Sequence, residues 1–364
     1  MKKNILINIY VAIFSLSVCF LSGEIIVRFF FQDEISKERL EIGLRGNEGA
    51  KKLVRPSQDP EIFYELIPDL DTSFLGKSVK TNAEGLRVGK SDTGNDSSND
   101  KKIRIAGVGD SSMFGWGVEQ EDTYLRLLEG LLNNSNAEHK FRSFNFAVPG
   151  YNSAVESAVF KKKALKVKPH VLILHYDHND AELLGELYPP DYIAPGVGDN
   201  FLHSALIKWT VRRVRYFLNK DRIYYKNVNK LFQGNFVEGP DYDNHLNALK
   251  EIASSAEKNG ILPYIVIGDP WIKRVPDRNK DPHYLFLHKK LVFHLTKFGY
   301  GVLDLYDFFQ FHMKKNDWEN LRQLWIDTKF PYDAHPNEAG HKVIADAIFS
   351  RISNDPKFRE MINR

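Results

Sequence analysis

Short apolar runs alternate with amphipathic stretches along the C-terminal two-thirds of the chain. The apolar runs have the length of buried strands, and they fall at residues 103–109, 144–150, 171–176, 262–269 and 300–307. The stretches around them repeat apolar residues at helical spacing, at 123–132, 153–167, 243–260 and 338–352, with one more helix expected before the last strand. This alternation predicts right-handed crossovers and a parallel sheet covered by helices on both faces, a three-layer α/β/α fold.

The N-terminus has a different pattern. Residues 5–23 carry no charge, and an apolar helix of about 20 residues matches the roughly 30 Å hydrocarbon core of a bilayer. We predict a retained transmembrane anchor over residues 1–31, because the small-residue cleavage site of a signal peptide is absent and Cys19 lies too deep in the run for lipid attachment. Lys2 and Lys3 favour a cytoplasmic N-terminus, which places the rest of the chain outside the cytoplasm, in a periplasmic or similar compartment.

The rest of the chain divides by composition into an extension and a larger domain. Residues 32–100 form an N-terminal extension that ends in a polar linker rich in Gly, Ser, Asn and Asp. The strand and helix alternation then occupies residues 101–364, with an insertion near 184–240. Within this insertion, the basic stretch 206–218 fits a solvated helix better than a helix resting on an anionic membrane.

The composition excludes two classes of function. The 50 basic residues against 47 acidic ones give a formal net charge of +3, so there is no large positive field to attract nucleic acid. Cys19 is the single cysteine of the sequence, which excludes an internal disulfide and a cysteine-based metal site.

The segment GVGDSS places two serines directly after the first strand. A serine at the carboxyl edge of a parallel sheet is exposed, and the N–H groups of a following helix can point at a developing negative charge. Gly107 and Gly109 would let a substrate approach the backbone closely. The arrangement suits Ser111 as a nucleophile, although a strand-to-helix turn with a capping serine has the same residues.

Two neutral hydrogen-bond donors follow the next two strands. Gly150 ends the segment AVPGYN, and Asn179 lies in HYDHND. Placed around Ser111, a glycine N–H and an asparagine amide would complete an oxyanion hole for a tetrahedral intermediate. A turn glycine and a helix-capping asparagine are the alternative interpretations of the same two residues.

A histidine and an aspartate precede the last predicted helix. Asp333 lies two residues before His335, and side chains at i and i+2 share a face in extended backbone. The carboxylate could therefore orient the imidazole and stabilise its charged form, as a serine triad requires. A capped helix start with an incidental histidine is the alternative, and Asp304 and Asp327 are rival acids in the same half of the chain.

A second cluster raises the possibility of a metal centre. His175, Asp177, His178 and Asp180, with Asp110, have the residue types of a metallophosphoesterase. The Asn-His-Asp/Glu and Gly-His-x-His elements expected of such an enzyme are absent, so this interpretation is disfavoured.

Four segments together carry a resemblance to a known family. GDSSMFGWGVEQEDTYLRLLEGLL, NFAVPGYNS, HYDHND and DAHPNEAGH follow the order of the sequence blocks of the SGNH (GDSL-type) hydrolases. The chain resembles that family over roughly residues 103–354, apart from 184–240. The resemblance implies a flavodoxin-like order of the parallel sheet, an ester-cleaving or acyl-transferring activity, and no metal or organic cofactor.

The resemblance also implies a role for each motif residue. Ser111, rather than Ser112, is the nucleophile, and His335 is the general base. Gly150 and Asn179 form the oxyanion hole together with the Ser111 amide. The usual last block reads Asp-x-x-His, whereas this chain has Asp-x-His, which resembles membrane-associated relatives that acetylate or deacetylate envelope polysaccharides. The assignment of the acid is therefore less direct than that of the serine and histidine.

We therefore expect a membrane-anchored serine esterase that acts by a Ser-His-Asp mechanism on a carbohydrate O-acyl or lipid ester. One alternative is an O-acyltransferase on envelope polysaccharide with the same triad, in which a sugar hydroxyl replaces water. The other alternative is a non-catalytic envelope-binding protein on the same fold.

Overall fold

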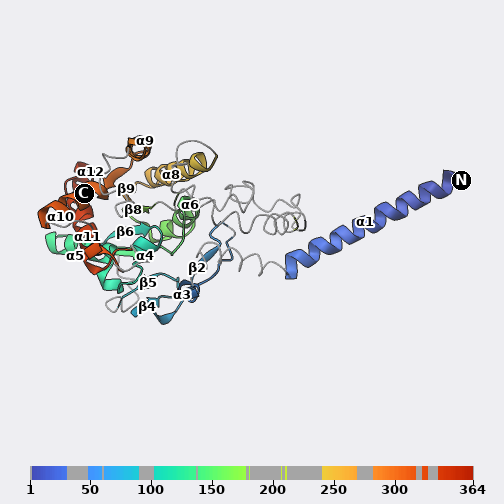
Figure 1. Cartoon of the computed structure of the whole chain (residues 1–364), viewed down its shortest axis with the longest axis horizontal. Helices are drawn as coiled ribbons and strands as arrows, with labels where there is room; N and C mark the ends of the chain where they lie inside the picture. Colours follow the sequence, from blue (N-terminus) through green and yellow to red (C-terminus); the bar gives the residue numbers. More distant parts are fainter. Residues whose placement is uncertain are drawn as a thin grey trace.

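The computed structural model describes most of the chain (Figure 1). It covers residues 2–30, 48–59, 61–89, 102–136, 138–177, 180, 206, 210, 240–268, 282–316, 322–326 and 335–363. Asn179 and Asp333 lie outside these residues, as do the polar linker and most of the 184–240 insertion. The domain boundaries predicted at residues 31 and 100 both fall in gaps between described segments.

A five-stranded parallel sheet forms the centre of the molecule. Its strands are β6 (Lys102–Val108), β7 (Lys140–Asn145), β8 (Val171–Tyr176), β9 (Leu262–Ile267) and β10 (Gly301–Asp304). Their spatial order is β7-β6-β8-β9-β10, and every neighbouring pair runs parallel. In chain order this is 2-1-3-4-5, the doubly wound order of flavodoxin. The predicted parallel α/β architecture and its strand order are therefore confirmed.

Helices cover both faces of this sheet. On one face α5 (Tyr124–Ser135) packs against α11 (Glu338–Ser353), and on the other α6 (Ser153–Lys162) packs against α8 (Pro240–Lys258) (Figure 1). The remaining helices are α9 (Pro282–Lys297), α10 (Leu305–Asn316), α12 (Pro356–Ile362), and the short 3₁₀ turns η1 (Gln120–Asp122), η2 (Ala164–Val167) and η8 (Arg322–Leu324). Because β8 is buried along its whole length, its sequence is continuously apolar instead of alternating.

Two predicted strands end earlier than their apolar runs. β7 stops at Asn145, and the residues up to Gly150 form a loop in which Phe146 N–H donates to the Gly107 carbonyl. β10 stops at Asp304, whose Oδ1 accepts from Tyr306 N–H and so starts α10. Apolar residues continue past each strand because the loops that follow are also buried, and an apolar run alone does not mark where pairing stops.

The extension before the linker has a structure of its own. After α3 (Glu48–Lys51) it forms a hairpin of β1 (Val54–Pro56) and β2 (Tyr64–Leu66), then an antiparallel sheet of β3 (Asp71–Phe74), β4 (Lys77–Thr81) and β5 (Arg87–Val88). Its buried side chains, Leu53, Ile62 and Val79 among them, belong to the same hydrophobic core as the central sheet. The extension is thus an integral part of the folded body.

The first helix, α1 (Lys2–Phe30), extends away from that body (Figure 1). Large apolar side chains are exposed along it, including Tyr10, Phe14 and Leu16, which are 66%, 70% and 70% exposed. Within the described part of the chain, no helix is long and apolar enough to cross a membrane. The predicted transmembrane anchor over residues 1–31 is therefore not supported by the structure.

Candidate active site

Ser111 is the first residue of α4 (Ser111–Phe114), the short helix that follows β6. Asp110 caps this helix, because its Oδ1 accepts from Ser112 N–H at 2.9 Å. Gly109 is required for close packing, since a Cβ there would lie 3.0 Å from the Cβ atoms of both His175 and Met113. The nucleophile candidate therefore lies at the carboxyl edge of the sheet, on a turn that leaves little room for movement.

His335 lies directly against Ser111, although the two are 224 residues apart in the sequence. Its Nε2 is 2.8 Å from Ser111 Oγ. The Asp110 carboxylate lies farther from the same hydroxyl, with Oδ2 at 3.3 Å. The shorter contact is the geometry in which an imidazole can take the hydroxyl proton as the oxygen attacks. The structure thus brings together the serine and histidine that the sequence selected.

Contacts to the backbone around His335 and to its ring fix its position. Its carbonyl accepts from Ile326 N–H at 2.9 Å, and the next residue, Pro336, pairs with Trp325 in an isolated bridge. Its ring stacks on Trp116, with centroids 4.8 Å apart and 19° between the planes. An indole face against the imidazole orients the ring, and an indole face of this kind attracts a cation.

Arg87 holds the other end of α4. This side chain, from β5 in the extension, is 3% exposed. Its guanidinium donates to the carbonyls of Phe114, Gly115, Val118 and Ser78 at 2.8, 2.7, 2.6 and 3.2 Å. Burial lowers the pKa of Arg87 to about 10, so the group stays charged at neutral pH. The extension therefore positions the loop that carries both Ser111 and Trp116.

The Gly150 turn is also tied to the extension. Gly150 has φ +81°, in the left-handed region that favours glycine. Tyr64 donates its hydroxyl to the Pro149 carbonyl at 2.9 Å, and Tyr151 donates to the Tyr64 carbonyl at 2.6 Å. These reciprocal bonds fix the turn on which the predicted oxyanion-hole glycine lies.

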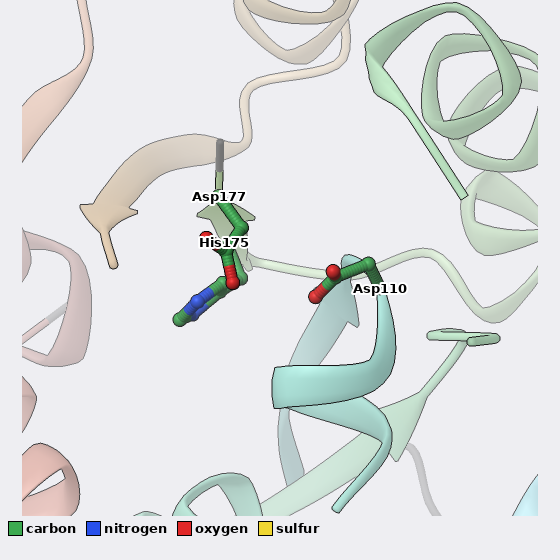
Figure 2. A group of neighbouring side chains, drawn as sticks. All are labelled: Asp110, His175 and Asp177. Atoms are coloured by element: carbon green, nitrogen blue, oxygen red, sulfur yellow. The ribbon is translucent and has the colours of Figure 1, made fainter. Parts of the chain in front are cut away.

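Three polar side chains, Asp110, His175 and Asp177, lie close together at the start of α4 (Figure 2). Ser112 Oγ donates to Asp177 Oδ2 at 3.0 Å, and the Tyr124 hydroxyl lies 2.9 Å from His175 Nδ1. Burial lowers the pKa of His175, although the nearby Asp110 and Asp177 carboxylates oppose this shift. The imidazole is accordingly neutral at physiological pH.

Asp110, His175 and Asp177 offer ligand atoms that all lie within 4.8 Å of one another, close enough to surround a cation. Asp110 caps α4 by accepting from Ser112 N–H, Asp177 accepts from the Ser112 hydroxyl, and His175 Nδ1 is engaged with Tyr124. These hydrogen bonds explain why the three side chains converge. The three side chains support the position of α4. Of the other residues weighed for a metal centre, His178 lies outside the described residues and Asp180 is not in this group.

The two remaining predicted site residues, Asp333 and Asn179, lie outside the described residues, as does the rival acid Asp327. Asp304, the other rival, caps α10 through Tyr306 N–H. Trp116, whose ring stacks on the histidine, is not among the predicted site residues. Its place two residues after the short helix that carries Ser111 could have indicated that it lies near the site.

No protein-family model and no curated protein matches the sequence. Solved structures of similar shape include an acetyl xylan esterase, at 16% identity over 69% of this chain and 100% of that one, with a TM-score of 0.45. A putative lipolytic protein of the G-D-S-L family from Desulfitobacterium hafniense is 14% identical over 69% and 99%, with a TM-score of 0.40. The esterase EstA from Pseudoalteromonas sp. is 12% identical over 72% and 100%, with a TM-score of 0.39. Likenesses of this size do not assign a family or an activity to the chain.

Proposed function

We propose that this protein is a serine esterase in which Ser111 attacks a carboxylic ester and His335 is the general base. The observation that carries the proposal is the 2.8 Å contact between Ser111 Oγ and His335 Nε2 at the carboxyl edge of the sheet. A nucleophile within hydrogen-bond distance of its base is the arrangement from which covalent acyl transfer proceeds.

The reaction follows from this pair. As Ser111 Oγ bonds to the ester carbonyl carbon, its proton passes to His335 Nε2, and the carbonyl oxygen becomes negatively charged. The backbone N–H groups of Ser111 and Gly150 and the amide of Asn179 are the proposed donors to that oxygen. His335 then returns the proton to the leaving alcohol, and a water attacks the acyl-serine by the same steps in reverse. Free acid and free enzyme result.

Asp333 is the proposed partner of the histidine. Its place two residues before His335 in the sequence supports this role, as does the resemblance of the segment DAHPNEAGH to the last block of SGNH hydrolases. A carboxylate on the far ring nitrogen would hold the reactive tautomer and stabilise the imidazolium that forms during attack.

The proposed substrate is an acyl ester of a carbohydrate or a lipid. Transfer of the acyl group to a sugar hydroxyl requires only that the sugar replace water in the second half of the reaction. Product analysis with a sugar acceptor present distinguishes the two, because a transferase forms a new ester whereas an esterase releases the acid.

We further propose that α1 attaches the protein to a membrane, with the folded body outside the cytoplasm. The exposed apolar side chains along α1 support this, because a surface of that kind is normally covered by lipid or protein. Lys2 and Lys3 before the apolar run support the orientation. Fractionation tests the attachment: the full chain should sediment with membranes, and a variant that starts at Glu48 should not.

The central test is hydrolysis of p-nitrophenyl acetate and longer p-nitrophenyl esters by wild type and two serine variants. Ser111→Ala should lower kcat by a factor on the order of 10⁶, the loss seen when a triad that acts as a unit is disabled. Ser112→Ala, the matched control, removes one hydrogen bond to Asp177 and should cost roughly tenfold. Mass spectrometry after treatment with a serine-directed phosphonate should find Ser111 labelled. A label on Ser112, or turnover that survives in Ser111→Ala, would refute the assignment.

A further inference from the structure

Two carboxyl groups lie buried against each other beside the candidate active site. Glu156 belongs to the first turn of α6 and is 0% exposed, and Asp180, shortly after β8, is 2% exposed. Neither residue has a role in the proposed ester cleavage. Buried carboxylates normally pair with a cation or with several N–H donors, so this pair needs another explanation.

The hydrogen bonds around the two residues show how they are accommodated. Asp180 accepts from Asp177 N–H, and from the Ser153 hydroxyl at 3.2 Å. Glu156 has no N–H or hydroxyl partner for either oxygen in the described chain, and the neighbouring group that acts on its carboxyl most strongly is the carboxyl of Asp180. Two carboxyl groups can bond to each other only when one of them carries a proton. Since Asp180 already accepts two hydrogen bonds, the proton belongs on Glu156, which donates it to Asp180.

The surroundings favour this protonated form. Burial raises the pKa of Glu156 well above its ordinary value, and the charged groups that act on it, Asp180, Asp110 and Asp177, are all acidic. Burial raises the pKa of two tyrosine hydroxyls, Tyr124 on α5 and Tyr300 before β10, and the charge of Glu156 adds to that rise. Nothing in this set supplies a positive charge that would favour the ionised carboxylate.

The helix α8, packed against α6, contributes two further ionisable groups. Glu251 of α8 pairs with Lys161 of α6 at 2.8 Å and accepts from Ser157. His245 of α8 lies 3.5 Å from the Tyr176 hydroxyl through Nε2. The lysine is therefore engaged at the outer side of α6, so it does not neutralise the buried pair.

The position of the pair connects the parts of the candidate site. Ser112, next to the nucleophile, donates to Asp177, and Asp177 N–H donates to Asp180. Asp180 is in turn bonded to Ser153, the first residue of α6, and to Glu156 one turn later. The Gly150 turn leads directly into this helix. A continuous set of hydrogen bonds therefore runs from the nucleophile helix α4 to the helix that follows the Gly150 turn.

We propose that Glu156 and Asp180, sharing a single proton, are positioning residues that hold the Gly150 turn at its working distance from Ser111. The inference rests on the proposed function, because Gly150 matters only if its N–H stabilises an oxyanion. Loss of the proton leaves two carboxylates in direct contact beside Asp110 and Asp177. Their repulsion separates α6 from the end of β8, and the oxyanion donors move with them.

The test compares Glu156→Gln with Glu156→Ala. The glutamine amide still donates to Asp180 but cannot ionise, so kcat for p-nitrophenyl acetate at neutral pH should stay within about threefold of wild type. Alanine removes the donor and leaves Asp180 charged, with the Ser153 hydroxyl as its remaining hydrogen-bond partner on α6. It should lower kcat roughly 10- to 100-fold with little change in KM, because an oxyanion donor acts on the transition state and a displaced one retains part of its effect.

The pH dependence gives a readout that needs no substrate. A carboxyl whose pKa is raised by folding stabilises the fold fully below its ordinary pKa and loses that contribution as the pH rises toward the raised value. The free energy of unfolding of the wild type should therefore fall from about pH 5 upward, and Glu156→Gln should flatten this fall. The decline of kcat at alkaline pH should weaken in the same variant.

Glu129→Gln is the matched control. Glu129 is a buried glutamate of α5, but it accepts from Arg126 at 2.6 Å and from the N–H and hydroxyl of Ser143 at 2.7 Å each. The same substitution there should change neither the alkaline limb of the rate nor kcat at neutral pH. Asp180→Asn replaces an acceptor oxygen with an amide nitrogen. It should therefore resemble Glu156→Ala, and it takes the place of that variant if the alanine protein does not fold.

Three results would overturn the proposal. One is a pH dependence of unfolding that is the same in Glu156→Gln as in the wild type, because it would show that no proton is shared. Another is a kcat equal to wild type in both Glu156→Ala and Asp180→Asn, because it would show that the pair has no positioning role. The third is a loss in Glu156→Gln as large as in Glu156→Ala. If instead the wild type shows no turnover that depends on Ser111, the proposed function fails, while the unfolding measurements still decide whether the pair holds a proton.

Discussion

Arg87 contacts the C-terminal end of the nucleophile helix α4, the Glu156–Asp180 pair is linked to its first turn through Asp177, and all three side chains are buried. On the base side, which we define as Arg87, Trp116 and His335, the cation keeps its charge by donating to four backbone carbonyls. On the oxyanion side, which comprises Asp177, Asp180, Ser153 and Glu156, a second carboxylate charge is avoided by sharing a proton.

This difference follows from the chemistry of the two groups. A guanidinium remains protonated even with its pKa lowered to about 10, and its fork of N–H donors matches the carbonyls at the end of a helix. A carboxyl group, by contrast, becomes neutral when it takes up a proton. Burial raises its pKa and so favours this protonated form. The Arg87 contacts should therefore tolerate changes of pH, whereas the oxyanion side should be sensitive to alkaline conditions.

The sharpest test of the comparison replaces two carboxyl groups by their amides: the proposed partner of His335, and Glu156 on the oxyanion side. Asp333→Asn should lower kcat by roughly 10⁴, because the orienting carboxylate of a serine triad must be ionised. Glu156→Gln should change it little, because that carboxyl acts as a donor. Steady-state kinetics of the two variants, with circular dichroism to establish folding, checks this. Near-normal turnover in Asp333→Asn together with a collapse in Asp304→Asn would transfer the role to Asp304.

Removal of the buried cation should break the base side. Arg87→Met leaves at least three buried carbonyls without their donor and should lower the free energy of unfolding by about 3–5 kcal/mol. In protein that still folds, kcat should fall roughly 10- to 100-fold as the loop bearing Trp116 shifts. Urea unfolding measures the first effect.

Arg55→Met is the control for Arg87, because Arg55 is a half-exposed arginine of the same extension whose ion pair with Glu65 lies at the surface. It should cost less than about 1 kcal/mol. Equal losses for the two arginine variants would mean that the carbonyl cluster does not depend on Arg87.

The smallest expected effect concerns the stacked ring. Trp116→Phe keeps an aromatic face near His335 but weakens the attraction for the imidazolium, which is worth about 0.5–1 kcal/mol at such a contact. We expect kcat to fall roughly 2- to 10-fold with KM nearly unchanged, and Trp116→Leu to fall further. An identical rate for tryptophan and leucine at this position would show that the stack has no part in stabilising the charged base.

Much of the central sheet follows from the sequence, because buried strands such as Val171–Tyr176 have few polar residues and are bounded by turns. The extension does not, since Lys77–Thr81 is short and largely polar and gains its strand structure from pairing with its neighbours. Ser111 and His335 can be found from sequence motifs, because few residue types can act as the nucleophile or the general base. Glu156 looks like an ordinary surface glutamate in sequence. Its burial comes from the packing of α8 on α6, which no local pattern records.

The contacts of the extension also affect when activity can appear during synthesis. Residues 71–88 leave the ribosome early, yet Lys77 pairs with Glu338, 261 positions later, and Tyr64 meets Pro149, 85 positions later. Contacts over such separations form late, after the intervening chain has been made and folded. A nascent chain that stops before residue 335 has its serine in place and no histidine beside it. The proposed ester cleavage therefore requires a chain that extends at least through His335.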